Sequence, residues 1–190
     1  MLFKKEIKER LLLTFIWLIV ISLLRWRFYL PLGLQTFDLV GFWLGGLLGT
    51  FFVDLDHWLH FLVIHPQEPT SLKIKQLLQS RRFKEAFILL SETRAERLKL
   101  TFHSALFQPL FYVLCFFVLT STANHFGSAL VMVMVLQLLK EELKPLLTGK
   151  EESLQKWLFW QIDIKASVQQ TKVFVFVMLL AFLGLHLLLI

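Results

Sequence analysis

The sequence lacks several features that would point to other classes of protein. It has a single cysteine, Cys115, so no intrachain disulfide can form and cysteine usage gives no information about the compartment. It has no internal repeat and no low-complexity linker, so we expect one domain over residues 1–190. No small-residue cleavage site follows the first apolar block, Leu11–Leu24, which therefore predicts a membrane helix and not a signal peptide.

Hydrophobic residues are abundant and gathered in blocks that charged stretches separate. They make up 56% of the chain, and the mean hydropathy is +0.65. This profile predicts an all-α polytopic membrane protein with four to five transmembrane helices plus cytoplasmic interfacial amphipathic helices. The expected spans are residues 11–30, 39–60, 98–121, 126–144 and 173–190, with the amphipathic segment at 66–97.

The distribution of lysine and arginine predicts the orientation of these spans, because positive charges are retained on the cytoplasmic side. With five spans, 18 of the 20 basic residues fall on the side that holds the N-terminus, and Arg25 and Arg27 fall on the other. We therefore expect a multi-pass protein with a cytoplasmic N-terminus. The basic, amphipathic 66–97 segment suits a membrane surface, so lipid is the expected partner and nucleic acid is not.

Acidic and histidine side chains interrupt the apolar blocks where three predicted spans reach the cytoplasmic boundary. The stretch "VDLDHWLH", residues 53–60, ends the second span, "TFHS" begins the third at about Leu100, and "LQLLKEE" ends the fourth. The topology thus brings residues from three separate segments to one membrane level. At about 100° per residue, Asp56, His57 and His60 share roughly one helix face.

Carboxylate oxygen and imidazole nitrogen are the ligands expected for a divalent metal such as Zn²⁺ or Mn²⁺. Such an ion would lower the pKa of a bound water and polarise a phosphoryl or carbonyl oxygen. The candidate metal ligands are Asp54, Asp56, His57, His60, His103 and Glu141, and the candidate catalytic residues are Asp54, His57 and His103. In the alternative interpretation, these residues cap helix ends and bind headgroups or neighbouring lysines.

Two short motifs resemble a known family. "VDLDH", residues 53–57, looks like the aspartate-x-aspartate-histidine element of the bacterial membrane-bound metal-dependent hydrolases of the YdjM type, and "LTFHSALF", residues 100–107, is similar to their threonine-histidine-serine segment. Gln137 and Glu141 stand where the family has a histidine and an aspartate, and its first-helix histidine has no counterpart. The resemblance implies an inner-membrane protein that hydrolyses a phosphoester at a metal cluster.

Two functions are therefore expected from the sequence. The first is a membrane-bound metal-dependent hydrolase of a phosphoester, with a lipid-linked substrate and a site at the cytoplasmic interface. The alternative is a non-enzymatic membrane protein, a scaffold or small transporter subunit, whose acidic and histidine cluster binds an ion or only caps helices.

Overall fold

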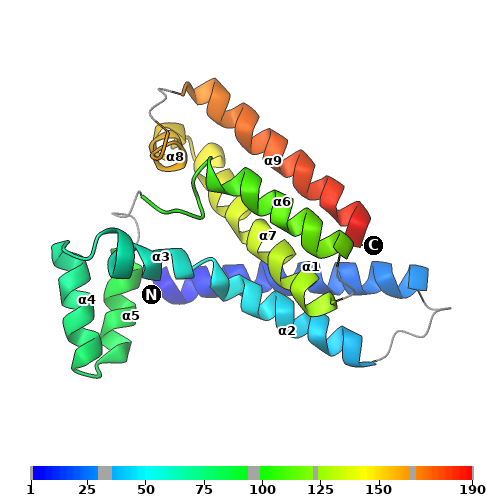
Figure 1. Ribbon diagram of the computed structural model, residues 1–190, viewed down its shortest axis with the longest axis horizontal. Coiled ribbons are helices and arrows are strands. Elements are labelled where there is room, and N and C mark those ends of the chain that lie inside the picture. Colours follow the sequence, from blue (N-terminus) through cyan, green and yellow to red (C-terminus); the bar gives the residue numbers. More distant parts are fainter. Residues whose placement is uncertain (1, 30–35, 94–98, 122–123, 163–165, 190) are drawn as a thin grey trace.

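All regular structure in the described part of the chain is helical, which confirms the predicted all-α class there. The computed structural model describes residues 2–29, 36–93, 99–121, 124–162 and 166–189. The helices are α1 (Leu2–Tyr29), α2 (Thr36–Phe52), α3 (Leu55–Leu59), the π-helix η2 (His60–Ile64), α4 (Pro69–Gln79), α5 (Phe83–Glu92), α6 (Phe107–Ser121), α7 (His125–Leu147), α8 (Glu151–Leu158) and α9 (Val168–Leu189) (Figure 1).

The long helices run between the same two ends of the molecule. Helices α1 and α2 lie antiparallel in one layer, and α6, α7 and α9 form a second layer that crosses it (Figure 1). The short helices α3, α4, α5 and α8 gather at one end, where the N-terminus also lies, and the C-terminus lies at the other. This arrangement brings the ends of α2 and α7 beside the start of α6.

Glycines allow α2 to pack tightly between α1 and α7. A side chain at Gly45 or Gly49 would collide with the backbone of α7 at Phe126 or Leu130, and one at Gly46 would meet Leu18 of α1. Small residues spaced four apart are typical of closely packed helices in membranes. These glycines therefore let α2 lie close to the first turns of α7 and to α1.

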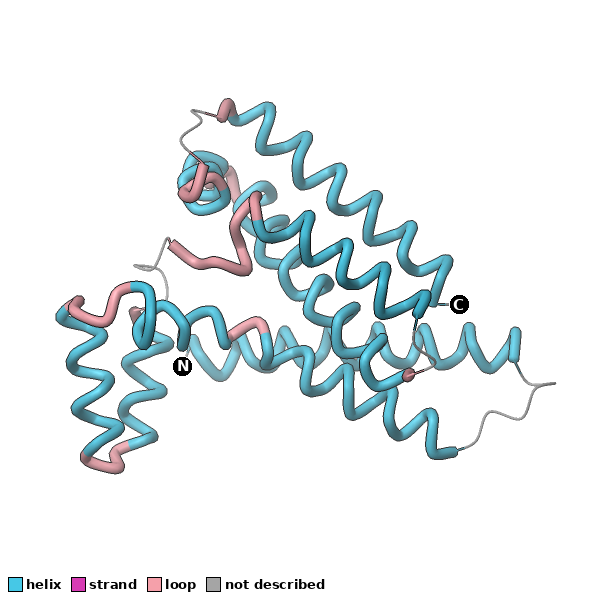
Figure 2. The backbone as a smooth tube through the Cα atoms, viewed as in Figure 1, coloured by secondary structure: helices cyan, strands magenta, loops and turns pink. Residues whose placement is uncertain are grey.

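The second predicted helix is broken near its end. Residues 39–60 were expected to be continuous, but α2 stops at Phe52, and the amides of Asp54, Asp56 and His57 bond to carbonyls three residues earlier (Figure 2). The chain bends by 40° across this break. Beyond the end of α2, Asp54 faces Arg10 of α1, and Asp56 faces the backbone amides of Thr101 and Phe102.

The prediction that a helix begins at about Leu100 is wrong, because α6 begins at Phe107. The amides of Thr101 and Phe102 donate to the carboxylate of Asp56 and not to helical carbonyls. Ser104 Oγ then accepts a hydrogen bond from Phe107 N, and Pro109 is tolerated in the first turn of α6. His103 therefore lies in a loop, residues 99–106, and not in a helix.

Helices α4 and α5 form a hairpin within the amphipathic segment predicted at 66–97, of which residues 94–98 lie outside the described part. Pro69 occupies the first turn of α4, a favoured position. Ile74 and Leu90 are buried against Phe61 of η2, whereas Leu72, Phe83 and Phe87 are exposed. The hairpin thus keeps an apolar surface outside its own small core.

One described helix, α9, is long and apolar enough to cross a membrane. The bent pair Leu39–Phe52 and Leu55–Ile64 meets the same criterion only if both parts count as one span, and the apolar α6 is shorter. By length and composition, α9 is therefore the described helix that supports membrane association.

Candidate functional site

Five charged or titratable side chains meet where α1, the α2–α3 turn, the 99–106 loop and α7 converge. This charged cluster consists of Arg10, Asp54, Asp56, His103 and Glu141. Arg10 donates to Asp54 Oδ1 at 2.8 Å and forms a second ion pair with Glu141 Oε1. His103 Nδ1 lies 3.0 Å from Asp56 Oδ2, and its Nε2 lies 2.9 Å from Glu141 Oε2. Two cationic groups thus alternate with three carboxylates.

His103 is fully buried between two carboxylates. Burial by itself lowers its pKa, but the hydrogen bonds and charges of Asp56 and Glu141 outweigh that effect and raise the pKa to about 9. The imidazole is therefore protonated on both nitrogens at neutral pH and donates to each carboxylate.

The 99–106 loop wraps around the carboxylate of Asp56. The backbone amides of Thr101 and Phe102 donate to its two oxygens at 2.9 and 2.7 Å, in addition to the bond from His103. Asp56 has no exposed surface. Three donors are the compensation that a fully buried carboxylate requires, so Asp56 fixes this loop against α3.

Three hydrogen-bonded, neutral side chains lie next to the charged cluster. Gln137 Nε2 donates to the backbone carbonyl of Arg10 at 3.2 Å and to Thr14 Oγ1 at 2.9 Å, and Thr14 and Thr50 share a hydrogen bond of 2.8 Å. All three side chains are buried. They join α1, α2 and α7 one turn from the cluster and so hold the backbone of Arg10 in place.

A cavity of about 190 Å³ opens beside the cluster, between α1, α2, α3 and α5. The polar residues that line it are Glu6, Arg10, Thr50, Asp54 and His57. Its apolar walls are Ile7, Leu11, Phe51, Trp58, Phe87 and Leu90. An amphiphilic molecule with one polar end matches this distribution.

The structure brings most of the predicted site residues together. Asp54, Asp56, His103 and Glu141 belong to the cluster, and the rings of His57 and His103 lie 6.4 Å apart between centroids. His60 is separate, because its ring nitrogens face the carbonyl of Lys99 at 3.1 Å and Glu68 at 3.4 Å. Asp54 precedes α3 but makes no side-chain cap bond to it in the described structure, and binds Arg10.

The described residues do not fit the metal that the family resemblance implies. The donor types are suitable, but no group of three or more histidine, cysteine, aspartate or glutamate side chains within the described ranges is positioned to hold a metal ion. The nitrogens of His103 and Arg10 face the carboxylate oxygens that a metal would need.

Arg10 is the main site residue that the sequence analysis missed, because it was counted only among the basic residues that set the orientation. Its one sequence signal is its position, directly before the apolar run that begins at Leu11. A charged residue at the edge of such a run usually extends to the headgroups, but Arg10 is only 4% exposed.

Comparison with protein-family models, curated proteins and solved structures finds no match for this chain.

Proposed function

We propose that this chain is a multi-pass membrane protein of the YdjM type that hydrolyses a lipid-linked phosphoester at the charged cluster. The observation that carries the proposal is the meeting of Asp54, Asp56, His103 and Glu141, from three separate segments, beside a cavity with apolar walls. Buried ionisable groups beside a cavity are typical of functional sites.

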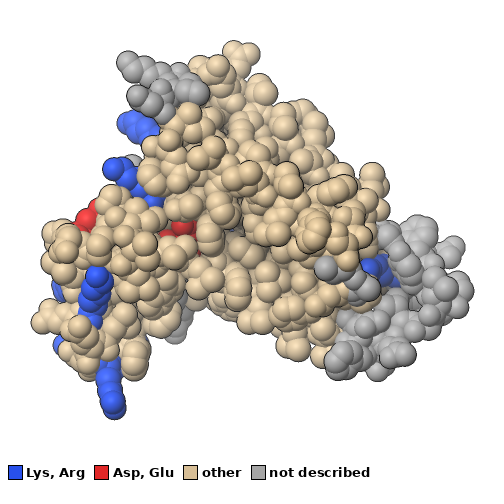
Figure 3. All heavy atoms as spheres, viewed as in Figure 1, with Lys and Arg blue, Asp and Glu red and all other residues tan. Residues whose placement is uncertain are grey.

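The outer surface supports the multi-pass part of the proposal. Large apolar side chains are exposed along α1, α2, α6 and α9, among them Leu23, Leu44, Val113 and Phe176, each more than half exposed. Most charged side chains visible in Figure 3 lie over the end formed by α3, α4, α5 and α8. An apolar surface of this extent on a monomer marks contact with lipid or another apolar partner. We place the charged end, with the N-terminus, on the cytoplasmic side of the inner membrane.

The proposed orientation predicts where reporters will function. A reporter fused after Gln79, in the α4–α5 hairpin, should behave as cytoplasmic, and one inserted at Asn124, before α7, as external. The physical reason is the retention of the basic end inside the cell. Reporter activity in living cells measures this, and the reverse pattern would contradict the orientation.

Three side chains on the cavity have suitable chemistry for phosphoester hydrolysis. The guanidinium of Arg10 lines the cavity while its terminal nitrogens bind Asp54 and Glu141, so it supplies positive charge beside the phosphoryl group of a bound substrate. Asp54 and His57 are candidate bases for an attacking water. His103 lies behind them and positions Asp56 and Glu141. The apolar walls suit the chain of a lipid-linked substrate.

The hydrogen bonds within the charged cluster favour a second candidate function. Each oxygen of Asp56 and Glu141 faces a donor, and the bonds join α1, α3, the 99–106 loop and α7. A non-enzymatic scaffold or small transporter subunit would use the same cluster to hold its helices together.

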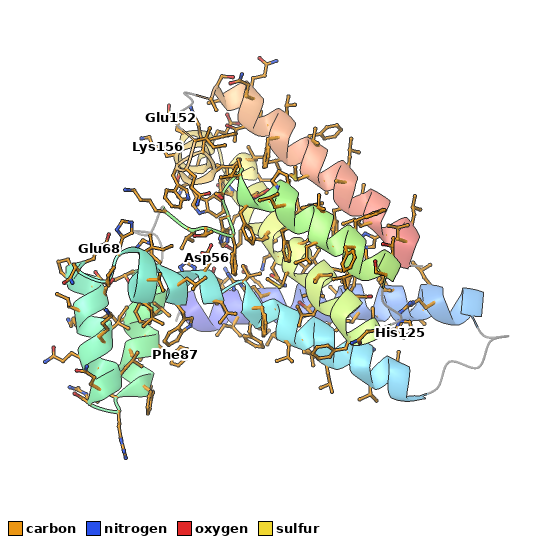
Figure 4. The ribbon with its side chains drawn as sticks, viewed as in Figure 1. Asp56, Glu68, Phe87, His125, Glu152 and Lys156 are labelled. Atoms are coloured by element: carbon orange, nitrogen blue, oxygen red, sulfur yellow. The ribbon has the colours of Figure 1, made fainter. Side chains whose placement is uncertain are left out.

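An activity assay distinguishes the two candidates. Purified protein in detergent should hydrolyse bis(4-nitrophenyl) phosphate or release phosphate from phosphatidic acid vesicles. Asp54→Asn and His57→Gln should each lower turnover by about 10²-fold or more, the usual contribution of a general base. The control is His125→Gln, because His125 lies at the other end of the molecule from Asp56 (Figure 4). No turnover by the wild type, or equal turnover by all four proteins, would favour the second candidate.

A further inference from the structure

The guanidinium of Arg10 lies where a bridging cation would bind. It reaches Asp54 Oδ1 at 2.8 Å with one terminal nitrogen and Glu141 Oε1 with the other, and the residue is 4% exposed. A divalent metal would have to approach the same oxygens to about 2 Å. The guanidinium and a metal therefore cannot occupy this position together.

An arginine between two carboxylates keeps its positive charge. Its pKa is so high that it does not vacate the site by losing a proton, as a histidine or lysine can. The neighbouring positive group, His103, bridges Asp56 and Glu141 in the same way. Three carboxylates thus face two organic cations, which removes most of the negative charge that would attract a metal.

Arg10 is also held in place by groups outside the cluster. Gln137 Nε2 donates to its backbone carbonyl and to Thr14 Oγ1, one turn along α1. These buried bonds fix the rotation and register of α1 against α7, so the guanidinium is directed at Asp54 and Glu141 by the packing of the helices.

We propose that Arg10 is the resident cation of the charged cluster and takes the place of a divalent metal, so that the site works without one. This inference goes beyond the proposed hydrolysis and does not depend on it, since the same cation would serve a scaffold. It replaces the metal that the family resemblance implies with a side chain of the protein.

The test compares metal binding by the wild type and by Arg10→His, using Zn²⁺ and Mn²⁺ titrations of purified protein and the thermal unfolding midpoint. The wild type should bind neither ion stoichiometrically, and its thermal unfolding midpoint should not change when either ion is added. Arg10→His replaces the fixed cation with a side chain that can lose its proton to a metal, and it should gain Zn²⁺ affinity by about 10-fold or more, the scale on which single groups act at metal sites. Its midpoint should then rise with Zn²⁺.

Two controls make the comparison specific. Lys8→His introduces a histidine on the same helix at an exposed position and should gain no affinity. Arg10→Lys keeps a positive charge at neutral pH and should gain less Zn²⁺ affinity than Arg10→His. One equivalent of metal in the wild type, lost in Asp56→Asn, would overturn the proposal even if Arg10→His fails to fold. Because the readouts are binding and stability, a protein without hydrolytic activity leaves this test intact.

Discussion

Replacing Glu141 with alanine is expected to lower the free energy of unfolding by about 3–5 kcal/mol, the usual cost of breaking a buried ion pair from one side. Glu141 is the carboxylate that binds both cations of the cluster, Arg10 through Oε1 and His103 through Oε2. Its side chain is only 16% exposed, so little water reaches the groups left behind. Both cations would lose one of their two carboxylate partners.

Thermal unfolding in detergent measures this effect, and a loss of about 3–5 kcal/mol corresponds to a fall of ~10 °C for a chain of this size. The matched control is Glu85→Ala, which removes an ion pair to Arg82 with both side chains at least half exposed. Exposed pairs contribute about 0–1 kcal/mol, so its midpoint should barely move. Equal shifts for the two variants would show that the charged cluster does not stabilise the fold.

Replacing Gly49 with leucine is expected to prevent α2 and α7 from packing as they do. A Cβ atom at this position would lie 2.5 Å from the backbone oxygen of Leu130 and 3.2 Å from Cβ of Val133. Overpacking a core usually costs about 1–3 kcal/mol, because neighbouring side chains adjust. Here the obstacle is backbone, so the helices must separate and we expect a loss of ~3 kcal/mol or more.

Folded yield by size-exclusion chromatography and the unfolding midpoint measure this loss. Gly49→Ala should show a smaller decrease of the same sign, since it adds the colliding atom alone. Gly184→Leu in α9 is the matched control, because nothing lies within 4 Å of a Cβ atom there. Leucine favours the helix over glycine by up to about 1 kcal/mol, so this variant should be neutral or slightly stabilised. A fold that tolerates leucine at Gly49 would contradict the close packing of α2 on α7.

Much of the site could be predicted because charged residues are rare inside apolar blocks. Asp54, Asp56, His103 and Glu141 stood out for that reason, and the alternation of the spans placed them at one level. The cluster in the structure contains all four. His60 stood out equally but lies outside the cluster, because its ring nitrogens face the carbonyl of Lys99 and the carboxylate of Glu68.

The sequence by itself determined the helical class, because apolar runs of this length are a local property of the chain and form helices wherever they pack. It also determined which side chains are costly to bury. Only the tertiary structure decided the partners of these side chains. Arg10 meets Asp54 and Glu141 across 44 and 131 residues of chain, and such pairings depend on how α1 is rotated against α2 and α7. The loop around Asp56 was likewise decided by contacts between distant segments, because the amides of Thr101 and Phe102 bond to this buried carboxylate and not to helical carbonyls.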